Sequence, residues 1–193
     1  MKLNTPATFE EAAKYEPDAI IAALGAKAIV PTFIEGWDRA NVFSAEDVYC
    51  DLSKAGDRVV ILGAGLVGCE LSLHLAMNGR KVTVLEKASV PNFEGNLLHG
   101  DAVMQKMKEL GVELKTGSKA ERIDDSGVIT SDGTHYSADT VIYAVGQRSR
   151  FEETDELRFA AGEFYSVGDC NIPATIAKAN KEAYYAARDI GRL

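Results

Sequence analysis

Short apolar runs alternate with amphipathic stretches along the chain, and this alternation predicts a layered α/β fold. The runs that predict strands lie at residues 18–24, 59–62, 82–85, 112–114, 140–145 and 164–167. Apolar residues at helical spacing predict helices over residues 44–49, 66–77 and 97–110 and a final helix from Pro173. The final helix has an apolar stripe made of Ile176, Ala179, Ala183, Ala186 and Ile190. Turn residues at 125–127 and 132–133 predict small antiparallel strands around them.

A glycine-rich turn joins one predicted strand to the next helix, in the segment VVILGAGLVGCE from Val59 to Glu70. In such a turn Gly63 allows the tight bend, Gly65 lets the backbone approach a pyrophosphate, and Gly68 lets helix and strand pack closely. The phosphates of a dinucleotide would lie on the helix N-terminus. The alternative is a strand-turn-helix that binds nothing. The candidate cofactor-binding residues of the turn are Gly63, Ala64, Gly65, Leu66, Val67 and Gly68.

An acidic residue, Glu86, ends the following predicted strand. In dinucleotide-binding turns, an acid about 20 residues after the glycines accepts hydrogen bonds from the adenosine ribose hydroxyls. Glu86 follows the glycines at close to this sequence separation. A 2′-phosphate would be repelled there, by about 4 kcal/mol at 4 Å and an effective dielectric constant of 20. We therefore expect NAD(H) to be preferred over NADP(H). Lys87, and Arg80 near the start of the strand, are alternative contacts for a phosphate.

No residue pattern predicts a metal site or a protein nucleophile. The histidines are scattered singly at His74, His99 and His135, and the cysteines at Cys50, Cys69 and Cys170. Neither set has the spacing of metal ligands or of a redox dithiol. Cys69 is expected to be a small packed residue. Glu70 is either a first-turn helix carboxylate or a residue near a bound nicotinamide.

Composition narrows the class of protein further. The chain has 193 residues, 46% apolar and 26% charged, and a formal net charge of −8. These values predict a folded globular protein, and the lack of a lysine- and arginine-rich stretch argues against a nucleic acid partner. No apolar run approaches the roughly 20 residues that cross a bilayer, and no signal-peptide core is present. We expect a cytoplasmic protein without a membrane partner.

Four short motifs occur in a fixed order: ALGA at residues 23–26, GAGLVGCE at 63–70, AVGQ at 144–147 and SVGDC at 166–170. This order resembles the two-dinucleotide flavoprotein reductases over the whole chain. In particular it resembles the C-terminal FAD/NAD(P)-binding region of the NADH:flavin oxidoreductases similar to 2,4-dienoyl-CoA reductase, enoate reductase and trimethylamine dehydrogenase. The resemblance implies a three-layer, Rossmann-like NAD(P)-binding domain, with a parallel sheet and a small antiparallel sheet, inserted in an incomplete FAD-binding domain. The implied pieces are residues 1–56 (FAD), 57–149 (NAD(H)) and 150–193 (FAD).

The resemblance also implies further cofactors and contacts. The FAD domain of the family opens with a glycine-rich unit of its own, which this sequence lacks, so we expect a fragment of a larger parent enzyme. FAD would bind only in the intact parent, and FMN and a 4Fe-4S cluster would belong to an N-terminal barrel. The implied roles place Gly146 near the bound nucleotide and Glu70 near the nicotinamide. Gly25, Gly168 and Asp169 are implied near the flavin, although Asp169 could instead be a turn or helix-capping residue.

The preferred functional interpretation is an electron-input module that passes hydride from NADH to FAD in the parent enzyme. The isolated chain is expected to have no turnover. The alternative is a non-catalytic module that holds ADP structurally, as in trimethylamine dehydrogenase-like proteins. A thioredoxin-reductase-like enzyme would need a dithiol, which the sequence lacks. The incomplete FAD domain should expose apolar surface, so self-association is a further hypothesis.

Overall fold

The computed structural model describes residues 1–93 and 97–192, and the chain forms two compact units. The larger unit is Ala28–Gly146, and the smaller unit combines Met1–Lys27 with Gln147–Leu193. Strands β2 (Ala26–Ala28) and β11 (Gln147–Ser149) pair with each other where the chain passes between the units. The predicted α/β class is confirmed.

A five-stranded parallel sheet forms the centre of the larger unit, in the order β3-β10-β4-β5-β6. Its strands are β3 (Val42–Ser44), β10 (Thr140–Tyr143), β4 (Arg58–Leu62), β5 (Lys81–Leu85) and β6 (Glu113–Lys115). From β4 the chain continues to β5 and β6 on one side, whereas β10 lies on the other side. The strand order therefore reverses between β4 and β10, and such a switch point leaves a crevice at the carboxyl ends of the strands.

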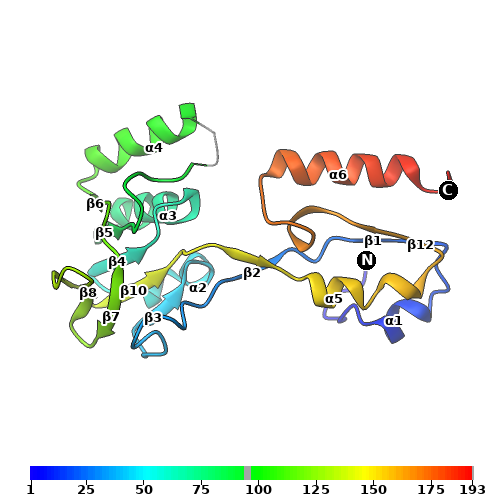
Figure 1. Ribbon diagram of the computed structural model, residues 1–193, viewed down its shortest axis with the longest axis horizontal. Coiled ribbons are helices and arrows are strands. Elements are labelled where there is room, and N and C mark those ends of the chain that lie inside the picture. Colours follow the sequence, from blue (N-terminus) through cyan, green and yellow to red (C-terminus); the bar gives the residue numbers. More distant parts are fainter. Residues whose placement is uncertain (94–96, 193) are drawn as a thin grey trace. The chain divides into compact units, whose positions relative to one another are not determined.

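The two faces of this sheet are covered differently, which gives the predicted three layers (Figure 1). Helices α3 (Leu66–Met77) and α4 (Leu97–Glu109) pack on one face around Ile61, Leu71 and Leu75, none of which is exposed. The antiparallel strands β7 (Ala120–Asp124), β8 (Gly127–Thr130) and β9 (His135–Ser137) pack on the other face around Val60, Ile123 and Val141. The sheet is thus buried on both sides, which is why its strands read as continuous apolar runs.

Residues 28–56 belong with the larger unit, so the unit boundary differs from the one predicted after residue 56. The reason is that Val42–Ser44 pairs in parallel with β10 and becomes the edge strand of the central sheet. Helix α2 (Ala45–Cys50) then packs on α3, and a short 3-10 turn (Leu52–Lys54) leads into β4. Ser44 caps α2: its side chain accepts from the backbone N–H of Asp47 at 3.0 Å.

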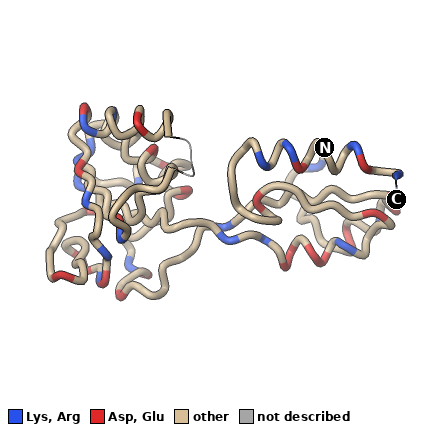
Figure 2. The backbone as a smooth tube through the Cα atoms, turned by 45° about the horizontal axis from the view of Figure 1, so that its top comes forward, with Lys and Arg blue, Asp and Glu red and all other residues tan. Residues whose placement is uncertain are grey.

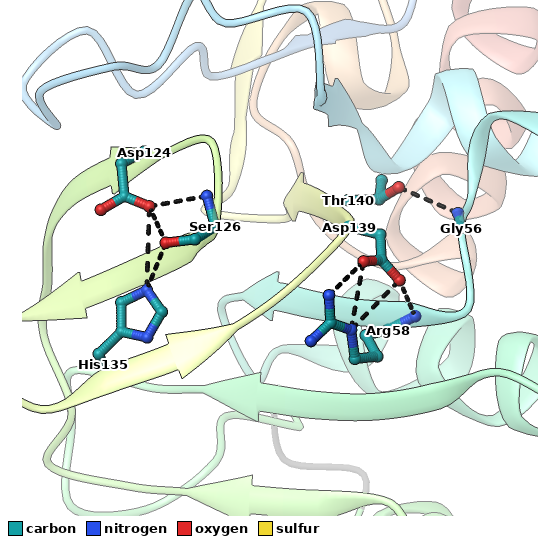
Figure 3. A network of polar contacts seen from close by, with 7 residues as sticks. All are labelled: Gly56, Arg58, Asp124, Ser126, His135, Asp139 and Thr140. Atoms are coloured by element: carbon teal, nitrogen blue, oxygen red, sulfur yellow. Dashed lines mark hydrogen bonds and ion pairs between the residues drawn. The ribbon is translucent and has the colours of Figure 1, made fainter.

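Two polar networks fix turns at the edges of the larger unit (Figure 3). At the amino ends of β4 and β10, Asp139 accepts from the Arg58 guanidinium at 2.6 Å and from the Arg58 backbone N–H at 2.9 Å. The Arg58 side chain is the main reason that the pKa of Asp139 is lowered. At the β7–β8 turn, Ser126 Oγ donates to Asp124 at 2.6 Å. Both networks hold strand ends together.

The smaller unit is built on two parallel strands, β1 (Ala19–Ala22) and β12 (Glu163–Ser166). Short helical segments surround them: α1 (Phe9–Ala13), α5 (Phe151–Asp155), η2 (Arg158–Ala160) and η3 (Gly168–Cys170). The last helix is α6 (Ile176–Asp189). It begins later than the predicted Pro173 because Thr175 is the N-cap, and its side chain accepts from the Lys178 N–H at 3.4 Å.

The apolar stripe predicted for the last helix is covered only in part. Ala186 is buried, with 5% of its surface exposed, whereas Ile176 at one end of α6 is 82% exposed. Tyr184, beside the stripe, is 66% exposed. The helical period was predicted correctly, but within the described residues most of that face has no partner to bury it.

Candidate functional site

A cleft of about 610 Å³ opens in the larger unit at the carboxyl ends of β4, β5 and β10. Its walls include Gly63 and Gly65 from the glycine-rich turn, Glu86 and Lys87 from the end of β5, and Gly146 beyond β10. This is the crevice expected at the switch point of the sheet. The position follows from the strand order, because the chain continues from β4 to β5 on one side of the sheet, whereas β10 lies on the other side.

Two of the three glycines in the turn are required by the fold itself. Gly63 has φ +108°, and a Cβ there would approach the backbone carbonyl of Ala144 to less than 3.0 Å. A Cβ on Gly68 would collide in the same way with the carbonyl of Gly63 and would also touch Ala144 Cβ at 3.4 Å. Any larger residue at either position would push α3 or the adjacent strands apart.

Gly65 is different, because nothing in the fold requires a glycine there. Its φ of −78° and ψ of 179° suit any residue, and the nearest atom to an added Cβ would be the Asn92 carbonyl oxygen at 3.8 Å. It is the N-cap of α3 and offers no side-chain cap to the first-turn N–H groups. The space beside Gly65 thus opens the positive end of a 12-residue helix to the cleft. Of the intervening residues, Ala64 is fully buried and Val67 is 42% exposed.

Glu86 lies directly beside the glycine-rich turn. Its Oε2 accepts from the Ala64 N–H at 2.8 Å, and its Oε1 accepts from the Ala88 N–H at 2.8 Å. Each carboxylate oxygen has lone pairs for more than one donor, so hydroxyl groups of a ligand can still donate to Glu86. The same two hydrogen bonds hold the Glu86 carboxylate at a fixed distance from the glycine-rich turn.

Arg80 and Lys87, the two predicted alternatives for a phosphate contact, lie at opposite ends of β5. Lys87 lines the cleft next to Glu86. Arg80 precedes β5 and donates to the Asn78 carbonyl at 2.9 Å. A five-residue strand is about 17 Å long, so Arg80 is at the wrong edge of the sheet to reach a ligand in this cleft.

A second lysine in the cleft, Lys119, was missed by the sequence analysis. Two backbone hydrogen bonds place its segment beside the end of β5: Ser118 N–H donates to the Glu86 carbonyl, and Gly117 N–H to the Ala88 carbonyl, both at 2.8 Å. Lys119 lines the cleft together with Glu86 and Lys87. The local sequence around it carries no signal of this, because the pairing joins segments about thirty residues apart.

Glu70 lies in the first turn of α3 and is not among the residues that line the cleft. Its Oε1 is 2.7 Å from Nε2 of His99 at the start of α4. Cys69, beside it, is completely buried, and burial, with the Glu86 and Glu70 charges, raises the pKa of its thiol to about 11. Cys69 is therefore a packed residue, as predicted, rather than a nucleophile.

The residues implied near a flavin lie in the smaller unit. Gly25 and Gly168 have positive φ angles of +73° and +72°. The Gly168 N–H donates to the Glu182 carboxylate at 2.8 Å, and Asp169 Oδ1 accepts from the Ala174 N–H at 3.1 Å. Asp169 thus bridges the turn before α6, a turn contact that leaves its second carboxylate oxygen available to a ligand.

In the part of the chain that the structure describes, we find little support for a metal site or a catalytic triad. No group of three or more histidine, cysteine or acidic residues there could hold a metal ion. The Asp124, Ser126 and His135 cluster resembles a catalytic triad only in composition (Figure 3). Both Ser126 Oγ, at 3.0 Å, and Asp124, at 3.8 Å, face the same ring nitrogen of His135, whereas a triad uses one nitrogen for each.

Lysine and arginine positions are interspersed with acidic ones in both units (Figure 2). Among the described helices, none has the length and apolar character needed to cross a bilayer.

Comparison with known proteins identifies the family of the chain. Residues 2–183 match the family model described as pyridine nucleotide-disulphide oxidoreductase. The chain belongs to this family. Its resemblance to flavoprotein reductases, inferred from the four motifs, is confirmed.

Individual relatives are larger proteins. The chain is 32% identical to cinnamate reductase of Clostridium sporogenes, covering 98% of the chain and 29% of the relative. It is 31% identical to bilirubin reductase of Mediterraneibacter gnavus, covering 97% and 30%. Among solved structures, 2-naphthoyl-CoA reductase in complex with 2-naphthoyl-CoA superimposes with a TM-score of 0.91 at 30% identity, over 98% of this chain and 29% of that one. The chain thus spans less than a third of the length of these oxidoreductases.

Proposed function

We propose that the chain is the pyridine-nucleotide-binding electron-input module of a flavin-dependent oxidoreductase, with NADH as the nucleotide. The observation that carries the proposal is Gly65: the fold does not need a glycine there, yet its missing side chain opens the N-terminus of α3 to the cleft. A pyrophosphate is the ligand chemistry that suits such a position, because N–H groups and the helix dipole both favour negative charge.

Glu86 supports the choice of NADH over NADPH. The acid is held beside the turn by the Ala64 and Ala88 N–H groups, so a ribose whose pyrophosphate lies on α3 has its hydroxyls near the carboxylate. A 2′-phosphate at the same place would meet a like charge. Even a third of the roughly 4 kcal/mol Coulomb energy at 4 Å is about a tenfold difference in affinity.

The hydride acceptor in this proposal is FAD, bound in the intact parent enzyme. Gly25, Gly168 and Asp169 are the residues of this chain that we assign to it, on the basis of the family motifs. Bound FAD would supply the chemistry of hydride acceptance, and the chain's own residues would bind and orient the nucleotide. The FMN and 4Fe-4S cluster of the parent, its unsaturated substrate and its cytoplasmic location remain parts of the proposal.

The proposal is tested by titrating the purified chain, checked by absorbance to be free of flavin, with NADH and NADPH while following nicotinamide fluorescence. We expect both to bind, NADH more tightly. Glu86→Ala and Glu86→Gln should narrow the ratio of the two dissociation constants. Lys81→Gln, at the far end of β5, is the matched control and should leave the ratio unchanged.

Two outcomes would contradict the proposal. If ADP binds tightly but the reduced nucleotides do not compete with it, the cleft is a structural ADP site. If the flavin-free chain oxidises NADH with turnover, the chain carries its own acceptor and is not an input module only.

A further inference from the structure

The wall of the cleft around Glu86 carries more positive than negative charge. Glu86 contributes one carboxylate, whereas Lys87 and Lys119 contribute two ammonium groups to the same walls. Within the described residues, neither ammonium has an ion-pair or hydrogen-bond partner, although the chain as a whole has a net charge of −8. Two unpaired lysines beside a partly buried carboxylate in an acidic protein indicate a place for an anion.

The backbone fixes this arrangement. The ladder between β5 and β6 continues past the strand ends, because the Glu86 N–H donates to the Lys115 carbonyl at 2.9 Å and the Ser118 N–H donates to the Glu86 carbonyl at 2.8 Å. The Lys119 carbonyl is itself held by the Ser131 N–H at 2.9 Å. Lys119 is therefore one residue away from a position bonded directly to Glu86, and its long side chain starts at the rim of the cleft.

We infer that Lys119 and Lys87 form a binding site for the 2′-phosphate of NADPH. In this arrangement Lys119 sets how strongly the cleft discriminates between NADH and NADPH. The inference rests on the proposed nucleotide site and refines it. Glu86 repels the 2′-phosphate and the lysines attract it, so the cleft accepts both nucleotides with a modest preference.

The test compares wild type, Lys119→Gln, Lys87→Gln and the control Lys81→Gln by titration with NADH and NADPH at low ionic strength. Lys119 is exposed, so its replacement should not disturb folding. We expect Lys119→Gln to weaken NADPH binding about fivefold, as for one partly exposed ion pair, and to leave NADH binding within about twofold. At about 0.5 M salt the difference should largely disappear.

The inference is overturned if Lys119→Gln changes the affinities for NADH and NADPH equally, or changes neither, while the wild type binds NADH. In that case the proposed nucleotide site stands and only the role of Lys119 is wrong. If the wild type binds neither nucleotide, the proposed function fails, and the inference fails with it. An equal effect of Lys81→Gln on NADPH would mean that total charge, rather than the cleft, attracts the phosphate.

Discussion

Replacing Gly65 by alanine should weaken nucleotide binding at least about tenfold without destabilising the fold. The Cβ of Gly65→Ala would have 3.8 Å to its nearest neighbour and a backbone conformation that alanine adopts freely. Removing a glycine restricts the unfolded chain and stabilises by about 0.4–1 kcal/mol, whereas alanine is a poorer N-cap by a similar amount. The free energy of unfolding should therefore change by less than about 0.5 kcal/mol.

The effect on binding should be much larger. The new methyl group would stand between the first-turn N–H groups of α3 and an incoming pyrophosphate. Losing one charge-assisted hydrogen bond costs about 1.5–3 kcal/mol, which is at least about tenfold in the dissociation constant. Nucleotide fluorescence titration and urea denaturation of the same preparation measure the two effects.

Gly68→Ala is the comparison variant for Gly65→Ala, because it should disturb both the fold and nucleotide binding. Its Cβ would lie less than 3.0 Å from the Gly63 carbonyl, so α3 and the turn must separate. Overpacking of this kind costs about 1–3 kcal/mol, and binding should fall because the site is distorted. If Gly65→Ala binds NADH as tightly as wild type, the open space beside Gly65 does not belong to a ligand. If it destabilises the fold as much as Gly68→Ala, our distinction between the two glycines is wrong.

Three further predictions concern groups outside the cleft. Exposed Cys50 should react rapidly with a thiol reagent at about pH 8. Buried Cys69, whose thiol pKa is raised to about 11, should react only when the protein unfolds. A fast reaction that remains in Cys50→Ser would contradict this prediction. Because Arg58 lowers the pKa of folded Asp139, its stabilisation is present above the unfolded pKa of about 3.9 and is lost as the pH falls through the folded value. The stability difference between wild type and Asp139→Asn should therefore be largest near neutral pH and shrink in acid, and a difference that is constant with pH in denaturation experiments would refute the ion pair. Exposed apolar surface on α6 should cause self-association that Ile176→Ser reduces, whereas a monodisperse wild-type monomer at high concentration, measured by light scattering, would refute the hypothesis.

Local signals were sufficient for the elements that carry the cleft. The apolar run of β4, the glycines that follow it and the apolar residues of α3 are contiguous, so their order alone predicts strand, turn and helix. The N-cap at Ser44 is equally local, because its partner Asp47 is three residues away. Strands β3 and β11 were not predicted, since three residues are too few for periodicity to distinguish a strand from a loop. The equally short β6 was predicted from its place directly after a predicted helix.

The sequence by itself determined the α/β class, the glycine-rich turn and the acid that follows it, because these depend on residues close together in the chain. Only the tertiary structure separated Gly65 from Gly68, since the difference lies in which distant atoms an added side chain would meet. Only the pairing of segments far apart in the chain placed Lys119 in the cleft, beside the end of β5. A sequence shows which residue types occur and with what period. Contacts across a sheet depend instead on the register between neighbouring strands, which is set by pairing between segments far apart in the chain.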